Sequence, residues 1–274
     1  MNDELHKKIL SDLDQSGFGS EMRSIRAFLA KDWGCRGGYY YFDEDTKQNR
    51  ETDLQAWHVK SKRFEGHTLL TEFGIIAEVK KTERPWVVFK REHTHGLEEL
   101  DAWNNLTCAV HLPCNLFELV DVLSQHSLLQ TLGWRGYSIH ESFKKPDAPS
   151  RWYSAFVSVC KATEAEFVRH SKGRPDLAIW HEFSIFKPVV IVDGPLMAAS
   201  LNDAGEVNLE EIDFAPFEFV HKSTMSTTDA YRVDLVKLDS LPKYVDLSEQ
   251  RLDAITSTLE SFMPTVLSQT DTKP

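Results

Sequence analysis

Two features that are common in exported and membrane-bound proteins are missing from this sequence of 274 residues. It has no run of eighteen apolar residues, which is the length that a membrane-crossing helix needs. Its first residues, 1–5, are acidic and lack the basic and then apolar pattern of a signal peptide. We therefore expect a cytoplasmic protein with no membrane partner.

Cysteine is scarce, and its spacing excludes two kinds of cross-link. None of the four residues belongs to a Cys-x-x-Cys pair, so a zinc site of paired thiolates is not expected. A disulfide framework would be unusual in a protein that is retained in the cell. We expect buried, reduced thiols at the four positions, which are Cys35, Cys108, Cys114 and Cys160.

Positive charge is also in deficit, with 31 Lys and Arg against 42 Asp and Glu and a formal net charge of −11. This balance argues against a protein that coats DNA, since affinity for phosphates grows with the number of basic residues placed against them. It does not exclude an enzyme with a locally basic cleft. The G-x-x-x-x-G-K-[ST] pattern of a P-loop motor is absent as well.

What is present is an alternation of helical and strand patterns. Apolar spacing predicts helices over 3–13, 20–33, 115–132, 152–170 and 248–262, and strands over 38–43, 52–59, 68–80, 86–89, 188–193, 217–221 and 231–238. In the second helix, Ser20 is the expected N-cap, and Met22, Ile25, Leu29 and Trp33 form the expected buried stripe.

No repeat or low-complexity linker divides the chain. We therefore predict a single α/β domain over residues 1–274, with a mixed central sheet flanked by helices. Its core spans 15–92, a helical and strand extension of the same sheet spans 93–267, and a polar, frayed tail spans 268–274.

The chemically informative residues lie on two neighbouring strands. Side chains alternate along a strand, so Glu78 and Lys80 project from one face, and Asp53 opens the strand expected to pair with theirs. Two carboxylates and an ammonium would then converge. Carboxylates bind a hard divalent cation that activates water and the phosphoryl group, and a lysine orients the water or stabilises developing charge.

This arrangement resembles the PD-(D/E)xK, or restriction-endonuclease-like, nuclease superfamily over residues 15–92. The resemblance implies that Asp53 and Glu78 bind Mg²⁺ or Mn²⁺, that Lys80 completes the catalytic centre and that Glu21 is an accessory metal ligand. It also implies cleavage of DNA, in defence, restriction or the processing of mobile elements. Thr52 precedes Asp53, where many members of the superfamily have a proline.

Other interpretations of the same residues remain open. Glu78 and Lys80 could form an ordinary ion pair at the rim of a sheet, with Asp53 in a turn. The chain could instead be an inactive protein of nuclease fold that serves as a structural or interaction module. RNA rather than DNA could be the substrate, and the sequence leaves a homodimer or a protein partner undecided.

Accessory residues are expected around the centre. Gln55 shares a strand face with Asp53 and is either an accessory site residue or a polar residue of the sheet. Lys60, Lys62, Arg63 and Lys81 belong to a mildly basic segment, which predicts either substrate binding or solvated strand ends.

The remaining polar motifs favour structural roles. His93 and His95 lack a third metal ligand nearby and are expected in a loop. The pairs His140-Glu141 and His181-Glu182 are expected to be structural, and Asp193-Gly194 is expected to form a turn.

Overall fold

A computed structural model describes residues 3–92, 106–124, 133–145, 147–172, 179–222 and 230–270. Its helices are α1 (Asp3–Ser16), α2 (Phe18–Leu29), α4 (Leu116–Ser124), α5 (Arg151–Lys172) and α6 (Leu241–Thr270), with a 3-10 turn η2 (Leu238–Ser240). Its strands are β1 (Gly34–Asp43), β2 (Gln48–Phe64), β3 (His67–Lys81), β4 (Trp86–Glu92), β5 (Thr107–Val110), β6 (Trp134–Glu141), β7 (Trp180–Asp193), β8 (Leu196–Leu201), β9 (Val207–Glu211), β10 (Phe214–Val220) and β11 (Ala230–Lys237).

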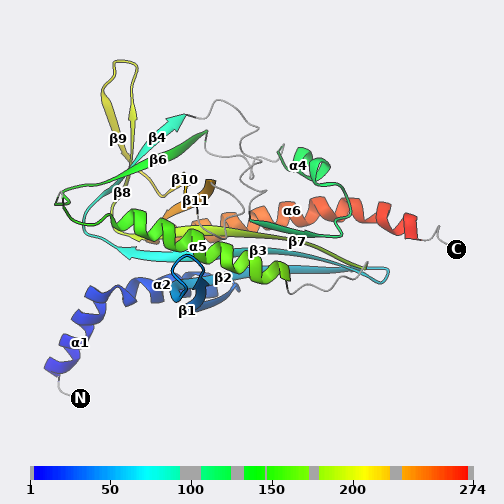
Figure 1. The fold of residues 1–274 in the computed structure, drawn as a ribbon, viewed down its shortest axis with the longest axis horizontal. Coiled ribbons are helices and arrows are strands. Elements are labelled where there is room, and N and C mark those ends of the chain that lie inside the picture. Colours follow the sequence, from blue (N-terminus) through cyan, green and yellow to red (C-terminus); the bar gives the residue numbers. More distant parts are fainter. Residues whose placement is uncertain are drawn as a thin grey trace.

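The strands form one mixed, 11-stranded sheet that runs through both halves of the chain. Its order is β1-β2-β3-β7-β11-β10-β6-β4-β8-β9, with β5 paired to β7. Helix α5 covers one face at the centre of the sheet and α6 covers the other (Figure 1). The sequence-based expectation of a mixed sheet flanked by helices is confirmed, and the later strands join the sheet of the earlier ones. No helix among the described residues is long and apolar enough to cross a membrane.

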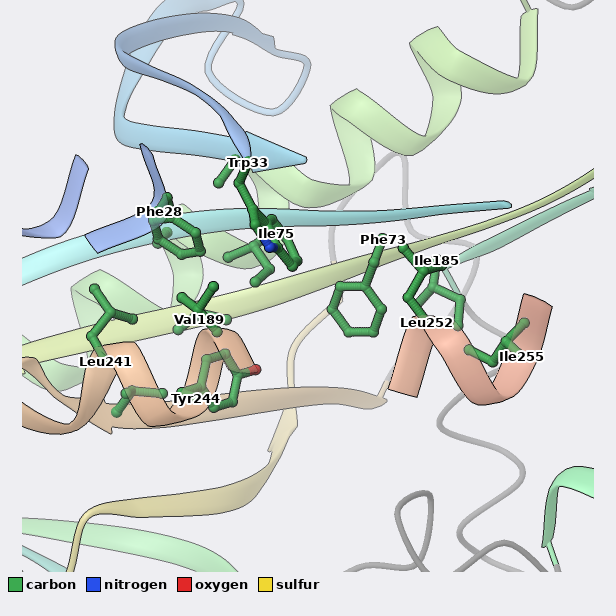
Figure 2. Close-up of a cluster of buried hydrophobic side chains, with 14 of the residues drawn as sticks. Phe28, Trp33, Phe73, Ile75, Ile185, Val189, Leu241, Tyr244, Leu252 and Ile255 are labelled. Carbon is green, nitrogen blue, oxygen red and sulfur yellow. The ribbon is translucent and has the colours of Figure 1, made fainter. Parts of the chain in front are cut away.

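Strand β3 lies between two cores because its successive side chains point to opposite faces. Ile75 and Ala77 pack with α2 and α6, whereas Ile76 packs with α5. Figure 2 shows the α6 side, where Phe28, Ile75 and Tyr244 belong to one cluster of buried side chains. The alternation that buries both faces of β3 also decides which of its polar residues face α5.

Strand β7 begins at Trp180, eight residues before the predicted start at Pro188. The predicted strand began where the continuous apolar run begins, at Pro188, and a proline cannot donate a backbone hydrogen bond. Phe186 donates its N–H to the carbonyl of Leu106, so the nitrogen of Pro188 points to the same side of β7. On that side, pairing with β5 ends at Ile185 and pairing with β11 begins at Val189. The missing donor therefore falls in a gap and interrupts no ladder.

The prediction for α2 was wrong in two respects. Gly17, in a left-handed conformation with φ 91°, precedes the helix as its N-cap, and Ser20 lies inside the first turn. Met22 and Leu29 are exposed, while Phe28 is fully buried. The helix ends at Leu29, so Trp33 is not part of it. The buried residues of α2 are Ser20, Ser24 and Phe28, and none of them belongs to the expected apolar stripe.

Four strands escaped prediction: β5, β6, β8 and β9. The last of these is exposed along its whole length and projects with β8 as a hairpin (Figure 1), so it has no buried face to impose an apolar alternation. Helix α6 also starts earlier than expected and extends to Thr270, into the segment predicted to fray. The predicted helix over 115–132 is confirmed for 116–124, and its remainder lies outside the described residues.

Candidate functional site

The register of the β2–β3 hairpin places Asp53 beside Glu78. Leu54 is paired with Ala77 in an antiparallel ladder, and Asp53 and Glu78 are the next residues along each strand. Glu78 and Lys80 share a face of β3 because they are two residues apart. All three side chains thus lie on the face that α5 covers, and the expected convergence is found.

One ammonium lies between the two carboxylates. Lys80 Nζ is 2.6 Å from Glu78 Oε2 and 3.3 Å from Asp53 Oδ2. The backbone N–H of Val79 donates to Asp53 Oδ2 at 2.6 Å, and Ser158 Oγ of α5 donates to Glu78 Oε1 at 2.8 Å. Both acids are therefore held in fixed orientations, from the backbone of β3 in one case and from α5 in the other.

The electrostatics of this group show a deficit of positive charge. Burial raises the pKa of Glu78, and the nearby Asp53 carboxylate raises it further, against the opposing effects of Lys80 and Ser158. Burial lowers the pKa of Lys80, but Glu78 and Asp53 outweigh it and the net pKa is raised. Lys80 is consequently a firmly protonated ammonium, and a further cation would relieve the repulsion between the carboxylates.

Glu21, in the first turn of α2, lies within electrostatic reach of the same group. Burial raises its pKa, and the charge of Asp53 raises it further, while Lys80 lowers it. Among the described residues, the ligand oxygens of Glu21, Asp53 and Glu78 do not all lie within 4.8 Å of one another. The donor set suits a hard cation, because it consists of carboxylate oxygens. Asp53 and Glu78 would bind it, with Glu21 as an outer contributor of charge.

Gln55 is buried and belongs to a neighbouring polar network. Its Oε1 accepts hydrogen bonds from Arg36 Nε at 3.0 Å and Nη2 at 2.5 Å. It also hydrogen-bonds Glu166 of α5, whose Oε2 accepts from the Tyr39 hydroxyl at 3.0 Å. This environment favours the interpretation of Gln55 as a satisfied polar residue of the sheet, adjacent to the site.

The structure does not bring Lys60, Lys62 and Arg63 to the triad. Lys60 is seven residues from Asp53 on β2, or roughly 23 Å along a strand. Lys60 forms an ion pair with Asp253 of α6, and Lys62 Nζ lies 2.6 Å from Glu260 Oε1. The prediction that these residues bind the substrate is therefore corrected. They are close to Asp53 in sequence, but an extended strand carries them far from it in space.

A different basic side chain lies near the end of β3. Arg151, at the start of α5, donates from Nη2 to the backbone carbonyl of Lys81 at 2.9 Å. Lys81 itself follows Lys80 and by alternation belongs to the opposite face of the strand. Arg151 is thus better placed than the predicted lysines to meet an anion beside the triad.

The other described polar motifs have structural contacts away from the triad's carboxylates. His93 and His95 lie outside the described residues. His140 is exposed, and Glu141 accepts the backbone N–H of Arg151 at 2.8 Å, which is a structural role at the start of α5. Asp193 does more than form a turn, because its Oδ2 accepts hydrogen bonds from two residues of α2, Ser20 and Arg23.

The remaining predictions concern the thiols and the His181-Glu182 pair. None of the four cysteines, all of which lie among the described residues, forms a disulfide. Cys108 and Cys160 are buried as predicted, whereas Cys35 and Cys114 are only partly buried. Burial raises the pKa of Cys35 and of Cys114 to about 11. His181 is stacked on His67, with Nε2 2.9 Å from His67 Nδ1. Glu182 is fully buried against His170 of α5, a contact that was not predicted.

The polar residues that α5 contributes to this face of the sheet were not predicted, although the helix itself was. Ser158, Glu166 and His170 are spaced by eight and four residues, so they lie on one side of the helix. A polar series at helical spacing among residues that are otherwise buried was the available signal. Only the tertiary structure shows what each of these residues meets.

No family model, curated protein or solved structure matches this chain.

Proposed function

We propose that the chain is a metal-dependent nuclease that hydrolyses phosphodiester bonds of DNA at Asp53, Glu78 and Lys80. The observation that supports it is the position of one Lys80 ammonium between two carboxylates, 2.6 Å from Glu78 and 3.3 Å from Asp53. Metal-dependent hydrolysis of a phosphodiester uses carboxylates to hold the cation and a hydrogen-bond donor close to the developing negative charge.

Each residue of the triad has a separate task in this proposal. Asp53 and Glu78 hold Mg²⁺ or Mn²⁺, which when bound supplies Lewis-acid activation of the phosphoryl group. Lys80, whose pKa is raised, acts as a hydrogen-bond donor to the attacking water or to the phosphoryl oxygens and does not act as a base. Ser158 orients Glu78. Arg151, whose Nη2 donates to the carbonyl of Lys81 near the triad, is proposed to contact a phosphate of the substrate.

A second candidate is a non-catalytic module in which the triad is a structural ion-pair network. Its support is that both carboxylates already have hydrogen-bond donors in Lys80, Val79 and Ser158. Binding of Mg²⁺ or Mn²⁺ that is weakened by Asp53→Asn distinguishes the two functions, because a purely structural network has no need of a divalent cation.

The test is cleavage of single-stranded and double-stranded DNA, with matched RNA, in Mg²⁺, in Mn²⁺ and in a chelator. The wild type should cleave DNA only with a cation, and Asp53→Asn should lose cleavage and bind the cation more weakly. Ser261→Ala, an exposed position on α6 at the opposite face of the sheet, is the control for protein quality. A wild type that binds neither cation would favour the structural module, and cleavage of RNA alone would change the substrate.

A further inference from the structure

A second group of potential metal ligands lies under α5, apart from the triad. It consists of Glu72 on β3, His170 on α5 and Glu182 on β7, whose ligand atoms all lie within 4.8 Å of one another. Glu72 precedes Glu78 by six residues on β3, or roughly 20 Å along the strand. The two groups therefore share a sheet face and a covering helix but have no ligand in common.

The spacing of the donor atoms matches a small metal ion. His170 Nε2 lies 3.0 Å from Glu182 Oε1 and 3.6 Å from Glu72 Oε2. Ligands at about 2.0–2.1 Å from a tetrahedral zinc ion are about 3.3 Å apart. The two measured separations lie on either side of that value, and the third, between Glu72 and Glu182, is at most 4.8 Å.

The surroundings of Glu182 resemble the outer shell of a metal ligand. Its side chain is fully buried, Trp180 Nε1 donates to Oε2 at 3.0 Å, and Ser184 Oγ donates to Oε1 at 2.7 Å. Hydrogen bonds of this kind orient the carboxylates that coordinate metals. Both donors belong to β7, so the orientation of the Glu182 carboxylate does not depend on the position of α5.

The chemistry of the donor atoms suits a divalent cation. The Glu182 carboxylate is fully buried, the Glu72 side chain is 14% exposed, and His170 Nε2 lies close to both carboxylates. Imidazole with carboxylate oxygens is a ligand set that zinc accepts.

We propose that Glu72, His170 and Glu182 bind one zinc ion, which ties α5 to the centre of the sheet. Three protein ligands leave one tetrahedral position for water. The ion would connect β3, β7 and the C-terminal part of α5, three elements that are distant in sequence. This inference does not depend on the nuclease proposal, because the two groups use different residues.

The test uses the full chain, stripped of metal and titrated with Zn²⁺ by calorimetry, with the melting temperature followed in parallel. With excess Mg²⁺ present to occupy the triad, we expect one equivalent of Zn²⁺ to bind and to raise the melting temperature. His170→Gln and Glu72→Gln should each lower the affinity at least tenfold and remove the thermal shift. His140→Gln, at an exposed histidine of β6, and Asp53→Asn, in the triad, should leave both unchanged.

A measurement on the wild type keeps the test independent of how the variants fold. Zinc should protect His170 from diethylpyrocarbonate, with the modified residue located by mass spectrometry, while exposed His140 should react with or without zinc. Failure to protect His170, or the absence of saturable binding at micromolar Zn²⁺, would overturn the proposal. Loss of zinc binding in Asp53→Asn with retention in Glu72→Gln would assign the ion to the triad instead.

Discussion

The two ends of the β2–β3 hairpin organise their charges differently. At one end, Lys60 and Lys62 each have an acidic partner on α6, so positive and negative charges balance. At the other, Asp53 and Glu78 share a single Lys80, so one negative charge is left over. Balanced pairs are typical of a helix docked on a sheet. Unbalanced acids under a helix are what a cation site requires.

The largest expected effect is at the unbalanced end. Lys80→Ala should lower cleavage by about 10²–10³-fold, because it removes the donor nearest to the developing charge. Lys81→Ala is the matched control, since the neighbouring lysine belongs to the opposite face of β3. Equal losses in the two variants, measured as kcat with Mg²⁺, would show that the site had been assigned to the wrong lysine.

The same substitution should also destabilise the fold. Glu78 is buried, and without Lys80 its charge is uncompensated, which costs on the order of 3 kcal/mol of unfolding free energy at neutral pH. The pKa of Glu78 in the folded protein is already above the ordinary value of 4.5, so the folded state takes up a proton first as the pH falls. The deficit should therefore shrink as the pH falls towards about 5, as measured by urea denaturation. A deficit that grows on acidification would contradict this assignment.

Ser158→Ala should have a smaller effect on the same carboxylate. Ser158 donates to Glu78 and lowers its pKa, so its removal raises that pKa further. We expect a loss of about tenfold in kcat and a shift of the acidic limb of the pH–rate profile to higher pH. Ser154→Ala, one turn earlier on α5 and exposed, should cause neither change. An unchanged pH profile in Ser158→Ala would remove Ser158 from the site.

Arg151→Ala tests the basic residue that the structure brings near the triad. We expect KM for DNA to rise a few-fold with kcat nearly unchanged and a weaker dependence of KM on salt, because one phosphate contact is lost. A fall in kcat at constant KM would assign Arg151 to the chemical step.

The smallest effect is expected at the balanced end of the hairpin. Lys60→Ala and Lys62→Ala should leave kcat and KM unchanged and cost no more than about 1 kcal/mol of stability, because surface ion pairs contribute little. A rise of KM in either variant, larger than in Arg151→Ala, would mean that substrate lies along α6 and that the two ends have been distinguished wrongly.

The position of Lys60 and Lys62 relative to Asp53 could have been predicted from the sequence. Lys60 is an odd number of residues from Asp53, so strand alternation alone puts the two on opposite faces. That signal was present in the sequence and should have excluded Lys60 and Lys62 from the site. Arg63 shares the face of Asp53, but ten residues of extended strand separate them.

Other failures had no local signal. Ser20 has the side chain of an N-cap, yet it is buried and donates to Asp193, which is 173 residues away. Proline is uncommon inside a central strand, yet here the nitrogen of Pro188 points into the gap between β5 and β11. In both cases the deciding partner is distant in sequence, so propensity alone led to the wrong boundary.

The sequence by itself determined the alternation of β3 and with it the shared face of Glu78 and Lys80, because side-chain direction on a strand has a period of two and depends only on neighbours. It also predicted Asp53 next to them, through the pairing of a hairpin. Only the tertiary structure decided that Ser158 meets Glu78, across 80 residues, and that His170 joins Glu72 and Glu182. The physical reason is that the packing of α5 on the sheet depends on the whole apolar interface between them, and no short stretch of sequence contains that interface.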